Sequence, residues 1–236
     1  MKNQYFGDSN DCFKYDLLIF LSQANQLTGI RRLTTAWLLT PDDKCGDGGK
    51  TRYEQGVQRE SLYRFLQKCL KTKKREVAAL SEYFRRNVFD FEYCAYGDRP
   101  DLGFADRERE SYFQRIPERY LESAVVFLDP DNGLEVKSAG RSNLHKYVTY
   151  DEVGSLFRRM DNRSVLVIYQ HLPRVHRKLF LYGTFGELVT RFKCPVPISV
   201  SNNQIAFIIL TKTRGRRAAV CRALQEYTRS QLEIFD

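Results

Sequence analysis

A short apolar segment that ends abruptly in acidic and amide side chains is the strongest constraint on the fold of this chain. Residues 124–129 read Ala-Val-Val-Phe-Leu-Asp, a run too short for a helix and rich in β-branched and aromatic residues, which predicts a buried strand. Pro130 and Gly133 then turn the chain. The polar residues on this turn are Asp129, Asp131, Asn132 and Glu135. Open α/β folds bind ligands where their strands end, so this turn is a candidate site; a surface turn that caps a helix is the alternative.

A second segment repeats the pattern. Residues 164–169 read Ser-Val-Leu-Val-Ile-Tyr, which predicts another buried strand, and Gln170 and His171 follow it directly. We therefore expect Tyr169, Gln170 and His171 to lie near the first acidic turn, at the same edge of the sheet. A purely structural hydrogen bond for His171, and simple packing for Tyr169, are the alternatives.

Strand and helix patterns alternate along most of the chain. This order predicts an α/β fold, with a Rossmann-like, mostly parallel sheet covered by helices on both faces. Residues 197–200 and 204–210 flank Ser201-Asn202-Asn203 and predict a C-terminal antiparallel hairpin. The 236 residues, of which 42% are hydrophobic, suffice for one sizeable core, so we expect a single domain over residues 1–236.

The first residues form a polar, turn-rich segment. Asp8 to Asp11 can cap a following helix, whose apolar face begins at Phe13. The functional interpretation is a polar lid over the site, made by Asp8, Asn10, Lys14 and Tyr15; an ordinary helix cap with surface charges is the alternative.

A formal net charge of +9 favours an anionic partner, with nucleic acid as the leading candidate. A generally basic protein without such a partner has the same charge. The candidate phosphate contacts are Lys73, Lys74, Arg174, Arg177, Lys178 and Arg216.

The six cysteines form no Cys-x-x-Cys pair and only three histidines are present, so no zinc or other metal site is predicted. The start of the chain is polar and does not resemble a signal peptide, and no run approaches the roughly 20 apolar residues that cross a membrane. These features predict a cytoplasmic protein without a membrane partner, and they favour no particular oligomeric state.

Two short motifs carry a resemblance to a known family. One is the N-terminal set Gly7, Asn10, Asp11 and Lys14, similar to a Gly/Asn…Ala-Asp…Lys pattern; the other is Asp129-Pro130, similar to the start of a D/N-P-P-Y/F loop after a strand. Both resemble the bacterial adenine-N6 rRNA methyltransferases, which have the methyltransferase variant of the Rossmann fold. The resemblance implies base methylation with S-adenosylmethionine as cofactor.

The chain also departs from that family. Asp131-Asn132 replaces the Pro-Tyr or Pro-Phe pair whose ring stacks on the target base, although Tyr169 could supply a ring. The family's glycine-rich cofactor loop is matched only loosely by Gly46, Gly48 and Gly49. This departure makes the catalytic motif degenerate while leaving the fold expectation intact.

The polar residues on the two turns suit hydrolysis. Asp131 or Asp129 would activate water or stabilise a cationic sugar, Asn132 would position the substrate, and His171 would assist departure of the base. Our leading expectation is a DNA glycosylase without a cofactor, which rotates a modified base out of DNA and cleaves its N-glycosidic bond, as in phage defence. The layout faintly resembles uracil-DNA glycosylases, with an acidic or amide residue after one strand and a histidine after another.

Further candidates bind the substrate in this scheme: Asp8, Asn10, Lys14, Tyr15, Glu135, Tyr169 and Gln170. The alternatives are the methyltransferase, a nuclease whose magnesium ion is held by Asp129, Asp131 and Glu135, and a non-catalytic nucleic-acid-binding module.

Overall fold

The computed structural model describes residues 1–42, 51, 59–98, 109–136, 139–173, 175–202, 204–227 and 233–235. Within these ranges, one large sheet contains parallel strands β1 (Arg32–Trp37), β2 (Glu92–Tyr96), β3 (Ala124–Asp129) and β6 (Val165–His171). The remaining strands are β7 (Ile198–Ser201), β8 (Ile205–Thr211) and β9 (Glu233–Phe235). The strand order is β2-β1-β3-β6-β8-β7-β9, with β8 antiparallel to both of its neighbours. The predicted α/β class, the mostly parallel Rossmann-like sheet and the C-terminal hairpin are confirmed.

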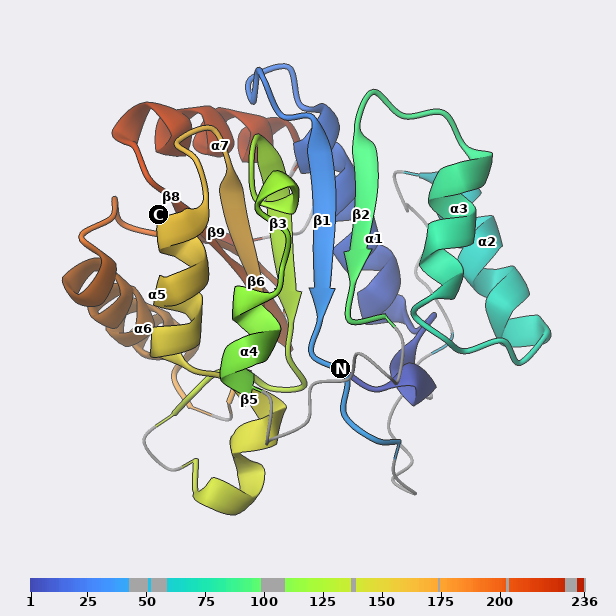
Figure 1. The fold of residues 1–236 in the computed structure, drawn as a ribbon, viewed down its shortest axis with the longest axis horizontal. Helices are drawn as coiled ribbons and strands as arrows, with labels where there is room; N and C mark the ends of the chain where they lie inside the picture. Colours follow the sequence, from blue (N-terminus) through green and yellow to red (C-terminus); the bar gives the residue numbers. More distant parts are fainter. Residues whose placement is uncertain are drawn as a thin grey trace.

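Helices cover both faces of this sheet (Figure 1). One face carries α1 (Ser9–Gln23), α2 (Glu60–Lys71), α3 (Ala79–Arg86) and α7 (Arg214–Tyr227), which share a hydrophobic cluster with the sheet. The other face carries α4 (Arg109–Gln114), α5 (Tyr150–Arg159) and α6 (Arg177–Phe192), which share a second cluster. The sheet therefore separates two cores, as expected for helices on both faces.

The interior strand β3 explains why the two cores form. Val125 and Phe127 belong to the cluster on the α1 face, whereas Val126 and Leu128 belong to the cluster on the α5 face. Successive side chains of a strand point to opposite faces, so an unbroken apolar run fills both cores at once. The buried strand predicted for residues 124–129 is confirmed, and its last residue, Asp129, lies at the carboxyl edge of the sheet.

Smaller elements lie between these helices and strands. The short helices are η1 (Asn3–Tyr5), η4 (Glu118–Tyr120) and η5 (Arg141–Lys146), and β4 (Gly133–Leu134) pairs in parallel with β5 (Tyr147–Val148). Pro117 precedes η4 and separates it from α4, since proline interrupts a continuous helix. The segment between β4 and β5 contains η5.

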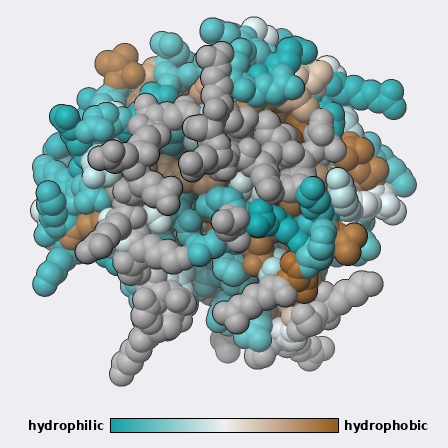
Figure 2. Space-filling model, turned by 180° about the vertical axis from the view of Figure 1, so that it is seen from behind, coloured by the Kyte–Doolittle hydropathy of each residue, from teal (hydrophilic) through white to brown (hydrophobic). Residues whose placement is uncertain are grey.

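Most of the coloured residues on the face that Figure 2 shows are hydrophilic, with separate hydrophobic spots among them. Among the described residues, no helix combines the length and the apolar character needed to cross a bilayer.

Candidate functional site

The N-terminal motif folds into a helix cap with two of its charges turned inward. Asp8 is the N-cap of α1 and accepts a hydrogen bond from the backbone N–H of Asp11 at 2.9 Å. Oδ2 of Asp11 accepts the N–H of Gly7 at 2.9 Å, and Oδ1 accepts Nζ of Lys14 at 2.7 Å. Asn10 is half-buried in the first helical turn. The expected cap is confirmed, and the motif additionally places Asp11 and Lys14 in the interior.

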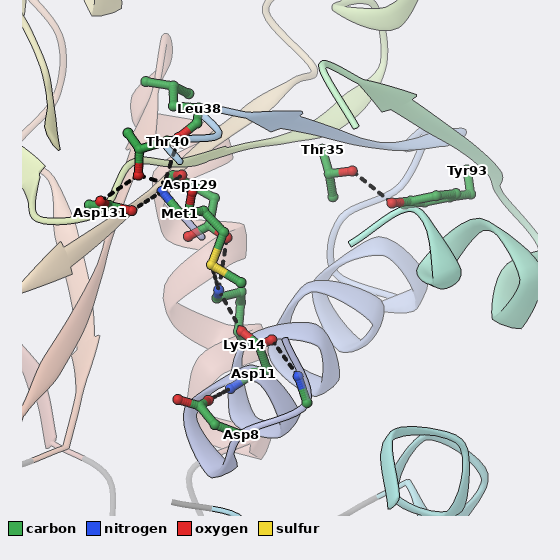
Figure 3. Close-up of polar contacts among 11 residues, drawn as sticks. Met1, Asp8, Asp11, Lys14, Thr35, Leu38, Thr40, Tyr93, Asp129 and Asp131 are labelled. Carbon is green, nitrogen blue, oxygen red and sulfur yellow. Dashed lines mark hydrogen bonds and ion pairs between the residues drawn. The ribbon is translucent and has the colours of Figure 1, made fainter. Parts of the chain in front are cut away.

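Lys14 joins this motif to the end of β3. Its Nζ donates to Oδ2 of Asp129 at 2.8 Å as well as to Asp11 (Figure 3). The ammonium group also lies 5.5 Å from the ring centroid of Tyr15 and 5.2 Å from that of Tyr169, within the range of cation–π attraction. Lys14 and Asp129 are only 2% and 1% exposed. The structure therefore brings together candidate residues from three separate parts of the sequence.

Asp131 is held by two other groups. One carboxylate oxygen pairs with the amino group of Met1, and Oδ2 accepts a hydrogen bond from Oγ1 of Thr40 at 2.7 Å (Figure 3). The Met1 amine also donates to the carbonyl of Leu38 at 2.9 Å. The Asp131 side chain is 5% exposed. Both oxygens are thus engaged inside the protein rather than directed at solvent.

Burial dominates the electrostatics of this group, which we call the acidic cluster: Asp8, Asp11, Asp129 and Asp131. Burial raises the pKa values of Asp8, Asp11 and Asp129, and the ammonium group of Lys14 opposes that rise. Burial by itself would lower the pKa of Lys14, but the carboxylates of Asp11 and Asp129 raise it above its ordinary value. Lys14 therefore carries its proton at neutral pH, and its ammonium group lies between the carboxyl groups of Asp11 and Asp129.

The end of β6 delivers its residues to opposite faces. Tyr169 packs with the α1-face cluster, so His171, two residues further along the strand, points to the same face. The side chain of His171 is exposed, and its backbone N–H donates to the carbonyl of Asn132 at 2.9 Å. Burial raises the pKa of Tyr169. The expectation that the two strand ends meet at one edge is confirmed.

Gln170 binds the protein's own backbone. Its Oε1 accepts the N–H of Leu134 at 2.9 Å, and its Nε2 donates to the carbonyls of Asn132 at 3.1 Å and His171 at 2.8 Å. Gly133 has φ of 115°, and a Cβ there would lie 2.4 Å from Oε1 of Gln170. The sequence predicts a substrate contact at Gln170, but its amide is buried and holds the acidic turn in place.

Glu135 lies away from the acidic cluster. Its Oε1 accepts the N–H of Tyr150 at 2.8 Å, at the start of α5, and its side chain lines a cavity on the α6 side. Asn132 is half-buried, and its N–H donates to the carbonyl of Lys146 at 2.8 Å. The three carboxylates considered for magnesium, Asp129, Asp131 and Glu135, thus have three different partners. Among the described residues, no group of three or more His, Cys, Asp or Glu side chains is arranged to hold a metal ion.

Tyr15 packs inside the protein. It is 1% exposed, and its ring meets that of Trp37 edge-on with centroids 6.1 Å apart. The sequence predicts a lid role for Tyr15, but it is a core residue whose ring lies against the ammonium group of Lys14.

The predicted phosphate contacts lie in separate places. Lys73 and Lys74 follow α2, whose last turn packs near Gly7, while Arg177 and Lys178 begin α6 just after the end of β6. These pairs border the carboxyl edge. Arg216 lies at the opposite edge of the sheet, because α7 follows the end of β8 that pairs with the beginning of β6. The guanidinium of Arg216 donates to the carbonyl of Thr28 at 3.1 Å. Arg174 lies outside the described residues.

Met1, Thr40 and Arg109 contribute to this edge of the sheet, although the sequence pattern does not predict a role for them. Thr40 is a polar residue just beyond the apolar strand β1, and this position was the one sequence feature that could have indicated a role at the edge of the sheet. Arg109 pairs with Glu152 through Nε at 2.6 Å and Nη2 at 2.8 Å, and it donates to the carbonyls of Leu144 and Tyr147, both at 2.7 Å. It fixes β5, which pairs with β4 beside the acidic turn. No local pattern marks Arg109 or Met1.

Comparison of the chain with protein-family models, with curated proteins and with solved structures found no match. Its function is therefore inferred from the acidic cluster and the groups around it.

Proposed function

We propose that this protein is an enzyme that acts on a base of DNA and hydrolyses its N-glycosidic bond after the nucleotide has been rotated out of the helix. The observation that carries the proposal is the acidic cluster at the carboxyl edge of the sheet, in which Asp11 and Asp129 are buried. The exposed side chain of His171 lies at the end of β6, at the same edge. Carboxyl edges are where ligands bind in open α/β folds.

Cleavage of a glycosidic bond develops positive charge on the sugar. Carboxylates held in a water-poor environment stabilise such charge more strongly than they would in water. Asp129 binds Lys14, and both oxygens of Asp131 are engaged, so the geometry favours an electrostatic role for these two residues over removal of a proton from water. His171 would donate a hydrogen bond to the departing base.

The surroundings fit a DNA partner. The chain has a net charge of +9, and Lys73, Lys74, Arg177 and Lys178 border the edge that contains the acidic cluster. Positive side chains in these places would contact phosphates while a base enters the site. The five described cysteines are free thiols, which fits work in a reducing cytoplasm.

The test is the formation of abasic sites. Purified protein is incubated with DNA carrying unmodified or modified bases, and alkali-labile sites are counted. We expect such sites on at least one modified substrate and their loss in Asp129→Asn and His171→Ala, while Asp90→Asn, a change at an exposed carboxylate, retains activity. Absence of abasic sites on every substrate, with folded wild-type protein, would overturn the proposal.

Methyl transfer from S-adenosylmethionine is the second candidate. It is favoured by the antiparallel strand β8 between β6 and β7 and by the hydrogen bond from Lys14 to Asp129, which joins the two motifs that resemble adenine methyltransferases. The sulfonium group of this cofactor is a cation, so the acidic cluster would suit it too. Calorimetry with S-adenosylmethionine separates the candidates: binding supports methyl transfer, and no heat at millimolar cofactor removes it.

A further inference from the structure

A cavity of about 520 Å³ lies on the face of the sheet opposite the acidic cluster. Its walls come from the segment beginning at β4, from Tyr150 at the start of α5, and from one side of α6. Small-molecule sites typically have volumes of about 300–1,000 Å³ and mostly apolar walls. The size of the cavity therefore suits a ligand such as a nucleoside.

Apolar side chains line one part of the cavity. Leu134, Val136 and Phe180 contribute hydrophobic wall, and Leu179, which is 69% exposed, forms an apolar edge open to solvent. At Gly183 nothing lies within 4 Å of the position that a Cβ would take. The missing side chain leaves room beside Phe180, where a planar ring could lie against apolar surface.

The polar end of the cavity consists of Glu187 and Arg191. Oε2 of Glu187 accepts Nε of Arg191 at 3.1 Å, and the guanidinium lies 4.8 Å from the ring centroid of Tyr150. Glu135 adds a second carboxylate to the lining. Carboxylate oxygens accept hydrogen bonds, so Glu135 and Glu187 favour a ligand group that donates, while the donating guanidinium of Arg191 is paired with Glu187.

We propose that this cavity binds an aromatic ring that carries an amino group, such as adenine, with the ring beside Phe180 and the amino group directed at Glu187. The ring can belong to a free nucleoside or to an unstacked base of single-stranded DNA. This site is separate from the acidic cluster, and its occupancy can be measured without any catalysis.

Calorimetry with adenosine and with a single-stranded oligo-deoxyadenosine tests the site and distinguishes the two sources. We expect Gly183→Leu to fill the cavity and weaken binding at least tenfold. Gly186→Leu is the matched control, since Gly186 lies on the same helix, also has nothing within 4 Å of its Cβ position, and does not line the cavity. Binding of either ligand that only Gly183→Leu abolishes supports the proposal. No binding of either ligand, or equal binding by both variants, would overturn it.

Inosine tests recognition of the amino group, because it carries an oxygen in that place. We expect the wild-type protein to bind inosine about tenfold more weakly than adenosine, and Glu187→Gln to reduce this preference because an amide can also donate. Equal affinities for adenosine and inosine in the wild-type protein would contradict the assigned ligand chemistry, whatever the outcome of the abasic-site assay.

Discussion

Nζ of Lys14 lies 2.8 Å from Oδ2 of Asp129, across 115 residues of sequence. This bond connects α1 to β3 and places one buried ammonium group between two carboxylates, Asp129 and Asp11. It is both a structural connection and the source of the charge distribution at the candidate site.

Replacing Lys14 with methionine should lower the free energy of unfolding by about 3–5 kcal/mol, because the two carboxylates lose their buried counter-ion. Chemical denaturation at pH 7 measures the effect. Lys71→Met is the control, since Lys71 is exposed at the end of α2 and its replacement should change stability by less than about 0.5 kcal/mol. A loss below about 1 kcal/mol for Lys14→Met would mean that the ion pair does not stabilise the fold.

Much of the fold follows from local pattern, and much of the site does not. The apolar run at residues 124–129 and the cap at Asp8 were predictable because strand burial and helix capping depend on neighbouring residues. The polar residues at the ends of β3 and β6 could be assigned to one edge because parallel strands end together. Periodicity carries no information on the pairing of Met1 with Asp131, which are brought together only by the assembled sheet. The contacts of Gln170 with the backbone of Leu134 and Asn132 also form only in the assembled sheet. The sequence pattern therefore predicts a ligand contact for Gln170 instead of its role in holding the turn.

The acid sensitivity of the fold should depend on Asp161. Partial burial raises the pKa of this carboxyl. Hydrogen bonds from Ser164 and Ser123 together lower the pKa by more than burial raises it, so the pKa of Asp161 lies below its ordinary value. The folded protein then binds this proton less tightly than the unfolded chain, and the stabilisation is complete above about pH 4 and lost as the pH falls through the folded-state pKa. Asp161→Asn should cost about 1–2 kcal/mol at pH 7 and flatten the decrease in stability below pH 4.

Urea denaturation from pH 3 to pH 7 checks the prediction for Asp161. Asp90→Asn, at an exposed position, should retain the slope of the wild-type protein. If Asp161→Asn and Asp90→Asn gave the same curves, the hydrogen bonds to Asp161 would not be the cause of the acid sensitivity.

Gly133→Ala should destabilise the protein by about 1–3 kcal/mol, because φ of 115° is strained for alanine and the new Cβ would displace the amide of Gln170. Gly186→Ala on the exposed side of α6 should instead add about 0.5–1 kcal/mol, since alanine favours a helix and meets no neighbour there. Thermal unfolding of both variants compares them directly. Tolerance of alanine at residue 133 would show that the turn does not depend on Gln170.

His171→Ala separates catalysis from folding at the candidate site. The side chain of His171 is exposed, so its removal should change the free energy of unfolding by less than about 0.5 kcal/mol. If His171 donates a hydrogen bond to the departing base, abasic-site formation should fall by about 100-fold or more, the usual contribution of a positioned acid. His171→Gln, which retains a donor, should recover part of that loss. Full activity of His171→Ala would exclude this role for His171, and an equal loss in both variants would exclude a simple hydrogen-bond donor.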